Sequence, residues 1–208
     1  MKHMFLTSYF AGTTDLFKIF AKEYILSKNV VFIPTAGKVE EYNEYIDEAE
    51  DSFKEMGFCL DVLDVTEVDE ENAAGRISNA EILYISGGNT FFLLQELVRK
   101  NLINLIRSRV EKGLIYIGES AGAIIASPSI EYSQIMDDKE VAKDLKSYNS
   151  LDLVDVYVLP HYEEYPFEEA AEQTLKMYGK ELNLITVNNS EAVVVDGEDY
   201  EITSNSGV

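Results

Sequence analysis

Short apolar segments alternate with longer amphipathic ones, and this alternation limits most strongly the folds that the chain can adopt. Mostly apolar runs of strand length occur at 3–9, 29–34, 58–65, 82–86 and 114–118. Strands that are apolar on both faces are typical of parallel sheets with helices on both sides. Helical spacing of apolar residues is expected at 13–27, 38–57, 69–78 and from about Thr90 onward.

The last third of the chain has a different pattern. Residues 154–160 (VDVYVLP) indicate a strand that leads into His161, and a helix is expected near 167–179. Three more strands, spaced like antiparallel hairpins, are expected at 184–187, 191–195 and 200–203. We therefore predict one α/β domain over 1–208, with a mostly parallel sheet flanked by helices on both faces and an antiparallel C-terminal edge.

The chain is strongly acidic, with 17 Lys and Arg against 38 Asp and Glu and a net charge of −21. Nucleic acids and anionic membrane surfaces bind basic patches, so the charge argues against both partners. A single cysteine, Cys59, excludes an intrachain disulfide, and its apolar strand predicts a buried thiol. No run of 18 apolar residues and no signal-peptide pattern occur, and we expect a cytoplasmic protein.

Residues 118–122 (GESAG) directly follow an apolar strand and precede a helical stretch. This is the G-x-S-x-G pattern in the strand–turn–helix context of a nucleophile elbow. Such a turn lifts the serine hydroxyl clear of the sheet, and the next backbone N–H faces a developing oxyanion. We predict that Ser120 is a nucleophile and that Ala121 is an oxyanion donor. The alternative is an ordinary tight turn of small residues.

A catalytic serine needs a base, and the chain has only two histidines. His3 opens the first strand, where a half-exposed structural role is expected. His161 follows a predicted strand, so it is expected with Ser120 at the edge where the carboxyl ends of strands meet. A second oxyanion donor is expected from Gly88, in the glycine turn after the fourth strand, with the adjacent Asn89 as a substrate-binding residue.

Three motifs together carry a family resemblance: 86–90 (SGGNT), 118–123 (GESAGA) and 160–162 (PHY). They resemble the peptidase E (aspartyl dipeptidase) family of serine peptidases, which is related to cyanophycinases and to the class I glutamine-amidotransferase-like fold. The resemblance extends over nearly the whole chain. It implies a cytoplasmic exopeptidase of short peptides, without metal or cofactor. The site residues that it implies are the nucleophile Ser120, the base His161 and the oxyanion donors Gly88 and Ala121.

The acid that orients His161 has two candidates. The resemblance implies a glutamate in the C-terminal part, which Glu191 matches. An aspartate shortly after the serine is the rival, matched by Asp137 or Asp138. We prefer Glu191, which gives a Ser-His-Glu triad, with Asp137 as the alternative acid.

One departure from the family bears on the substrate. The aspartyl enzymes carry an arginine downstream of the histidine motif, whereas residues 161–180 contain no arginine and several glutamates. Carboxylates repel an acidic substrate side chain, so strict Asp-X specificity is in doubt. We predict a serine exopeptidase of short peptides. An esterase or amidase and a non-catalytic member of the same fold are the alternatives, and the chain is either a monomer or a homodimer.

Overall fold

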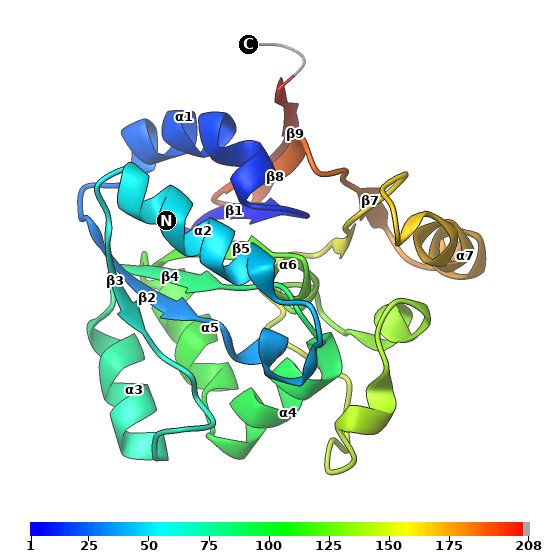
Figure 1. Cartoon of the computed structure of the whole chain (residues 1–208), viewed down its shortest axis with the longest axis horizontal. Helices are drawn as coiled ribbons and strands as arrows, with labels where there is room; N and C mark the ends of the chain where they lie inside the picture. Colours follow the sequence, from blue (N-terminus) through cyan, green and yellow to red (C-terminus); the bar gives the residue numbers. More distant parts are fainter. Residues whose placement is uncertain (206–208) are drawn as a thin grey trace.

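The computed structural model describes residues 1–205. Seven of its strands are β1 (His3–Thr7), β2 (Asn29–Ile33), β3 (Cys59–Val62), β4 (Ile82–Ile85), β5 (Ile115–Glu119), β8 (Glu191–Asp196) and β9 (Asp199–Ser204). They form one sheet in the order β3-β2-β4-β5-β1-β8-β9 (Figure 1). The first five in this order are parallel, and β8 and β9 are antiparallel. This arrangement confirms the predicted mostly parallel sheet with an antiparallel C-terminal edge.

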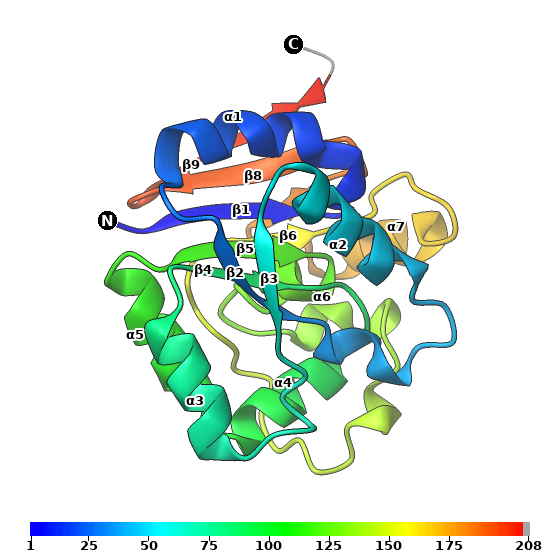
Figure 2. The same ribbon diagram turned by 60° about the vertical axis from the view of Figure 1, so that its left-hand side comes forward.

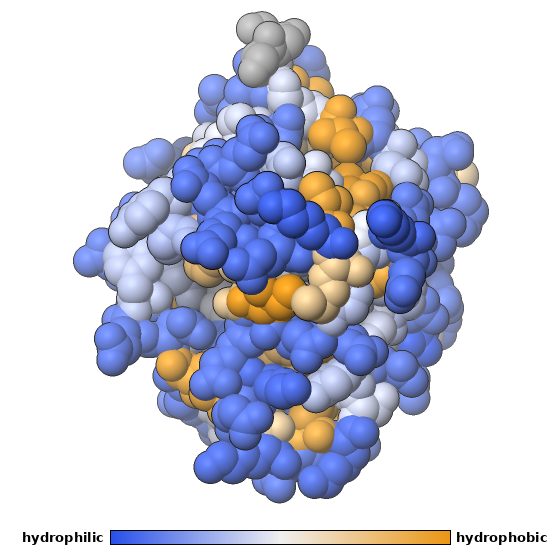
Figure 3. Space-filling model, turned by 90° about the vertical axis from the view of Figure 1, so that its right-hand side faces the viewer, coloured by the Kyte–Doolittle hydropathy of each residue, from blue (hydrophilic) through white to orange (hydrophobic). Residues whose placement is uncertain are grey.

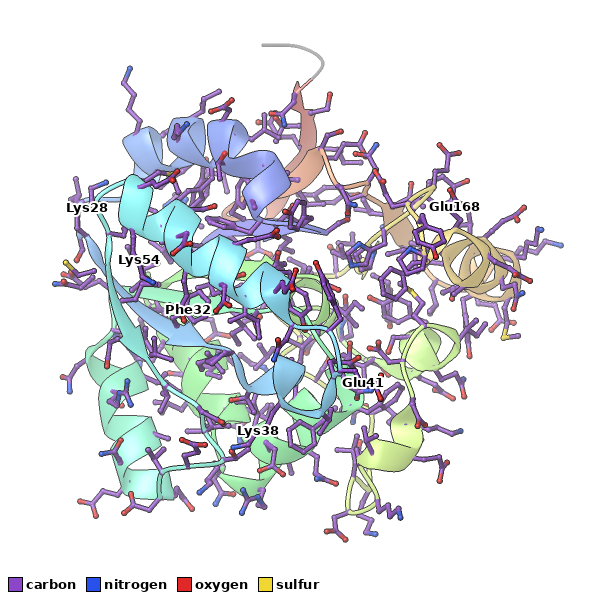
Figure 4. All side chains as sticks on the ribbon, viewed as in Figure 1. Lys28, Phe32, Lys38, Glu41, Lys54 and Glu168 are labelled. Carbon is purple, nitrogen blue, oxygen red and sulfur yellow. The ribbon has the colours of Figure 1, made fainter. Side chains whose placement is uncertain are left out.

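Helices cover both faces of the sheet, as Figures 1 and 2 show. One face carries α1 (Thr14–Tyr24) and α2 (Glu44–Glu55), and the other carries α3 (Glu70–Asn79), α4 (Thr90–Arg99) and α5 (Ile103–Glu111). The core under α1 and α2 is aromatic, with Phe53 of α2 packed against Phe32 and Tyr84. Figure 4 labels Phe32 in this core. The opposite core is mainly aliphatic. Burial of these two faces by the helices stabilises the sheet.

Two short strands form a separate parallel pair. These are β6 (Tyr157–Leu159) and β7 (Leu184–Thr186), joined through α7 (Glu168–Tyr178). The predicted antiparallel pairing of 184–187 is therefore wrong. A helix lies between β6 and β7, and such a crossover brings the second strand back parallel to the first. Only β8 and β9 form a hairpin, which turns at Gly197 with φ +65°. Figure 1 places α7 and β7 together at one end of the molecule.

Two local predictions need correction. The helix expected over 38–57 begins only at Glu44, because 35–39 forms a 3-10 turn whose Ala36 carbonyl accepts the Asn89 N–H at 2.9 Å. The helix expected from about Thr90 is confirmed as α4, and Asn101, whose φ is +53°, lies between α4 and α5. Cys59 is exposed, because β3 is an edge strand of the sheet.

Among residues 1–205, no helix combines the length and the apolar character that crossing a membrane requires. The short helix α6 (Ala121–Ile124) follows β5 directly and is buried.

Candidate active site

Three neighbouring strands of the sheet end at the same place, and each delivers one part of the site. Ser120 follows β5, the glycine pair 87–88 follows β4, and Ser8 follows β1. The carboxyl ends of adjacent parallel strands are where such sheets form their ligand crevices. The predicted nucleophile and the predicted oxyanion turn therefore meet because their strands are neighbours.

Ser120 has the backbone of a nucleophile elbow, with φ +47° and ψ −105°. This conformation is strained for a non-glycine residue and is found mainly at functional sites. The flanking glycines are required by close packing: a Cβ on Gly118 would lie 2.4 Å from the Gly122 oxygen, and a Cβ on Gly122 would lie 2.1 Å from the Ile85 oxygen. The Ser120 N–H donates to the Thr7 oxygen at 2.8 Å, which ties the elbow to β1.

His161 reaches the serine from outside the main sheet. It follows β6, which belongs to the two-stranded sheet, so the expectation that both residues end strands of one sheet is wrong. Its Nε2 nevertheless lies 2.9 Å from Ser120 Oγ. Its backbone N–H donates to Ser8 Oγ at 3.0 Å, and its ring stacks on Phe167 at 4.7 Å between centroids. These contacts hold the imidazole against the elbow.

The other ring nitrogen of His161 has an amide as its partner. Nδ1 lies 3.1 Å from Asn189 Oδ1, so Nδ1 carries the proton and Nε2 accepts from Ser120. The structure brings neither predicted carboxylate to the ring. Glu191 Oε2 accepts the Asn188 N–H at 3.0 Å, and Asp137 Oδ2 accepts the Thr90 N–H at 3.0 Å.

Two glutamates hold the turn that presents Asn189. Glu164 Oε1 accepts the Asn189 N–H at 3.2 Å, and Glu191 bonds the neighbouring Asn188 N–H. Burial lowers the pKa of His161, and the Asn189 bond and the charge of Glu164 act against this shift. His161 is therefore mainly neutral at neutral pH, as a base must be.

The predicted oxyanion donors lie in the turns that follow two neighbouring strands, β4 and β5. Gly88 has φ +125°, and a Cβ there would lie 2.2 Å from the Ala36 carbonyl carbon, so only glycine fits this turn. Ala121 opens α6, and its N–H lies in a first helical turn, where no intrahelical acceptor exists.

Asn89 has a structural role. Its Oδ1 caps α4 by accepting the Phe92 N–H at 3.0 Å, and its Nδ2 donates to the Asp138 oxygen at 3.0 Å. Because both ends of the amide are engaged within the protein, we expect Asn89 to hold the start of α4 in place and not to bind the substrate.

Most of the glutamates after His161 face solvent. Glu163, Glu168 and Glu169 are exposed, and Glu168, the first residue of α7, is labelled in Figure 4. Glu164 is half-buried, which agrees with its contact to Asn189. Figure 3, which views the side that carries α7, shows a mainly hydrophilic surface with scattered apolar patches.

In an α/β fold, a serine on a nucleophile elbow at hydrogen-bond distance from a histidine is the arrangement that defines the serine hydrolase class. Comparisons with known proteins narrow this class. Residues 4–203 match the model of Peptidase family S51. An uncharacterized peptidase of Pasteurella multocida is 43% identical over 205 residues, which are 99% of each chain. One from Listeria innocua is 40% identical over 199 residues, 96% of this chain and 95% of the relative.

Structural similarity agrees with the sequence comparisons. A crystal structure of a Listeria monocytogenes protein assigned to peptidase E matches with a TM-score of 0.92 and 37% identity over 98% of each chain. The chain therefore belongs to Peptidase family S51, the peptidase E family, and it is a serine peptidase.

Two polar residues at the site were not predicted from the sequence. Asn189 lies in the turn before β8 and contacts the His161 ring. Glu119 occupies a variable position of the G-x-S-x-G pattern and is 1% exposed. A glutamate at the end of an apolar strand, next to the predicted nucleophile, is the signal in the sequence that could have indicated Glu119.

Proposed function

We propose that this peptidase is a serine exopeptidase that hydrolyses short peptides, with Ser120 as nucleophile and His161 as general base. The observation that carries the proposal is the 2.9 Å contact between Ser120 Oγ and His161 Nε2. A nucleophile and a base at this distance transfer a proton directly as the bond to the carbonyl forms.

The reaction has two halves. Ser120 Oγ attacks the scissile carbonyl while its proton passes to His161 Nε2, and the oxyanion is bound by the N–H groups of Gly88 and Ala121. His161 then protonates the leaving amine, and an acyl-enzyme remains on Ser120. In the second half His161 accepts a proton from water, the water attacks the ester, and Ser120 recovers its proton.

Asn189 orients His161 in this proposal. Its Oδ1 accepts from Nδ1 at 3.1 Å, which leaves Nε2 free to receive the serine proton. A Cys-His-Asn arrangement performs the same task in other peptidases. Glu191, the acid of the predicted Ser-His-Glu triad, acts indirectly by fixing the turn at Asn188.

The substrate is a short peptide without an acidic side chain at its first residue. Relatives of this chain bear the name peptidase E, which supports exopeptidase activity. The carboxylates of Glu164 and Glu191 lie at the turn beside His161, and their charge repels a second carboxylate. We therefore propose that Ala-led and Lys-led dipeptides are cleaved better than Asp-led ones.

The test is a panel of Asp-, Glu-, Ala- and Lys-led dipeptides, with simple esters beside them, assayed with the wild type and with Ser120→Ala. We expect the wild type to cleave dipeptides and to prefer Ala-led or Lys-led ones. Ser120→Ala is expected to lose turnover and to keep its circular dichroism spectrum. Activity that survives in Ser120→Ala refutes the mechanism. Turnover of esters alone favours an esterase, and preference for Asp-led dipeptides refutes the substrate class.

A further inference from the structure

Glu119 is a buried carboxylate that has no role in the mechanism above. It ends β5, directly before Ser120, and is 1% exposed. Two of its hydrogen-bond partners, Phe10 and Tyr84, belong to the aromatic core under α1 and α2. No ion pair to it is found within residues 1–205. A buried charge without a cation is costly, so its retention calls for an explanation other than packing.

Three segments donate hydrogen bonds to this carboxylate. Oε1 accepts the Phe10 N–H at 2.7 Å, from the loop after β1. Oε2 accepts the Tyr84 hydroxyl from β4 and, at 3.5 Å, the Gly87 N–H. The carboxylate thus connects the ends of β1, β4 and β5, the three strands that supply the site.

Of the three contacts of Glu119, the one to Gly87 lies nearest to the proposed nucleophile. A Cβ on Gly87 would lie 3.3 Å from Ser120 Cβ, so this peptide passes directly over the nucleophile. Gly88, the next residue, supplies an oxyanion donor in the proposed mechanism. Its N–H is useful only if the turn is held at a fixed distance from Ser120.

We propose that Glu119 is a positioning residue for peptide hydrolysis: its ionised carboxylate holds the 87–88 turn beside Ser120 and so fixes the oxyanion hole. This proposal rests on the proposed function, since it needs Ser120 as nucleophile and Gly88 as donor.

The hydrogen-bond partners of Glu119 suit the ionised form of its carboxylate. All three partners of Glu119 are donors, and a protonated carboxyl group would need an acceptor that only the Tyr84 oxygen offers. Protonation therefore removes or reverses at least one of the three hydrogen bonds that Glu119 accepts. Burial raises the pKa of Glu119 to about 7, while the bonds from Phe10, Tyr84 and Gly87 act in the opposite direction.

The other titratable groups around Glu119 are acids. Glu48 of α2 raises the pKa of Glu119 by its charge. The phenols of Tyr9, Tyr45 and Tyr84 have raised pKa values, and each stays neutral near pH 7. Glu119 itself thus changes charge near neutral pH, and its ionisation is expected to limit activity on the acidic side.

The pH dependence of folding stability that Glu119 causes distinguishes a positioning role from a stabilising one. The folded-state pKa lies above the ordinary value of 4.5, so Glu119 favours the folded state below about pH 4.5 and loses this effect as the pH rises to about 7. The ionised form that the reaction uses is thus less favourable for stability than the neutral form.

The experiment measures the rate at which a fluorophosphonate probe labels the enzyme between pH 5 and 9, alongside the melting temperature. The variants are Glu119→Gln and Tyr84→Phe. Glu96→Gln is the matched control, because Glu96 is also buried, at 5% exposed, but pairs with Arg99 on α4. We expect Glu119→Gln to label at least tenfold more slowly at pH 8, with its melting temperature rising relative to the wild type as the pH increases from 5 to 8.

The pH profile gives the most specific readout. The wild-type labelling rate is expected to fall as the pH drops through about 7. In Glu119→Gln the remaining fall moves to lower pH, where His161 takes up its proton. In Tyr84→Phe it moves to higher pH, because a donor that stabilises the ionised carboxylate has been removed. Glu96→Gln is expected to follow the wild type.

Two results overturn the proposal: a Glu119→Gln rate within twofold of the wild type at every pH, or an unchanged profile in Tyr84→Phe. Because Tyr84→Phe leaves Glu119 in place, the proposal stays testable if Glu119→Gln does not fold. Failure of the proposed function gives a different result, since the wild type would then not be labelled or Ser120→Ala would still be labelled.

Discussion

Replacement of Asn189 tests which residue orients His161, the proposed general base. The Asn189→Ala variant removes the acceptor 3.1 Å from His161 Nδ1 and leaves Glu164 and Glu191 in place. A hydrogen bond between neutral groups contributes about 0.5–1.5 kcal/mol. Since about 1.4 kcal/mol corresponds to tenfold in rate, kcat/KM is expected to fall roughly two- to twelvefold.

Two further variants sharpen this prediction. Asn189→Asp puts a charge beside Nδ1, so we expect activity at least equal to the wild type at pH 8 and a raised pKa of His161. Glu191→Gln retains an oxygen that can accept the Asn188 N–H, so a change within about twofold is expected.

The assay is kcat/KM on the best dipeptide of the panel, measured from pH 5 to 9. In a Ser-His-Asp triad, changing the carboxylate that contacts the histidine to the amide lowers kcat on the order of 10⁴-fold. A loss of a hundredfold or more in Glu191→Gln, with Asn189→Ala within twofold of the wild type, would therefore show that Glu191 orients His161. That result would refute the orientation described above.

Three other substitutions test separate parts of the structure. In Gly88→Ala the new Cβ would lie 2.2 Å from the Ala36 carbonyl carbon, so the turn must shift. We expect kcat to fall about 10²–10³-fold. A kcat within threefold of the wild type would contradict this prediction. Asp137→Asn is expected to keep kcat/KM within about threefold, because Asp137 bonds Thr90 and not His161. Burial raises the pKa of Asp137 to about 6, so the stabilising effect of its neutral form is lost as the pH rises from about 4 to 6. Over this range, the unfolding free energy of Asp137→Asn is expected to rise relative to that of the wild type by about 1–2 kcal/mol. Urea titration measures this difference. Phe53→Ala removes a fully buried ring and should cost about 3–5 kcal/mol in the same titration; a cost below about 1 kcal/mol would mean that the aromatic core under α2 is packed differently.

The sequence was sufficient to predict the fold and to single out Ser120 and His161, which the structure brings into contact, because both depend on local signals. Apolar strands separated by helices indicated the parallel sheet, and the elbow motif indicated Ser120. With only two histidines in the chain, His161 was nearly determined by its position after a strand. The sheet that this strand joins was not determined, because pairing of β6 with β7 depends on packing between distant segments.

The partners of the site residues were harder to predict. Asn189 and Glu191 lie two positions apart on a turn and the start of a strand, and only the turn geometry decides which side chain faces His161. The role of Glu119 depends on Phe10, Tyr84 and Gly87, which three different segments bring together. The sequence shows that Glu119 follows an apolar strand, but not which groups surround its carboxylate.

The central claim is that Ser120 and His161 form the reacting pair, and covalent labelling tests it most directly. The folded protein is treated with a fluorophosphonate probe, and the adduct is located by mass spectrometry of its peptides. His161→Ala is compared with His3→Ala, in which the only other histidine, 3.1 Å from Asp196, is removed. We predict one adduct per chain, on Ser120, with labelling that is slowed strongly in His161→Ala and unchanged in His3→Ala. A folded wild type that stays unlabelled, an adduct on another residue, or equal rates in the two histidine variants would contradict the claim.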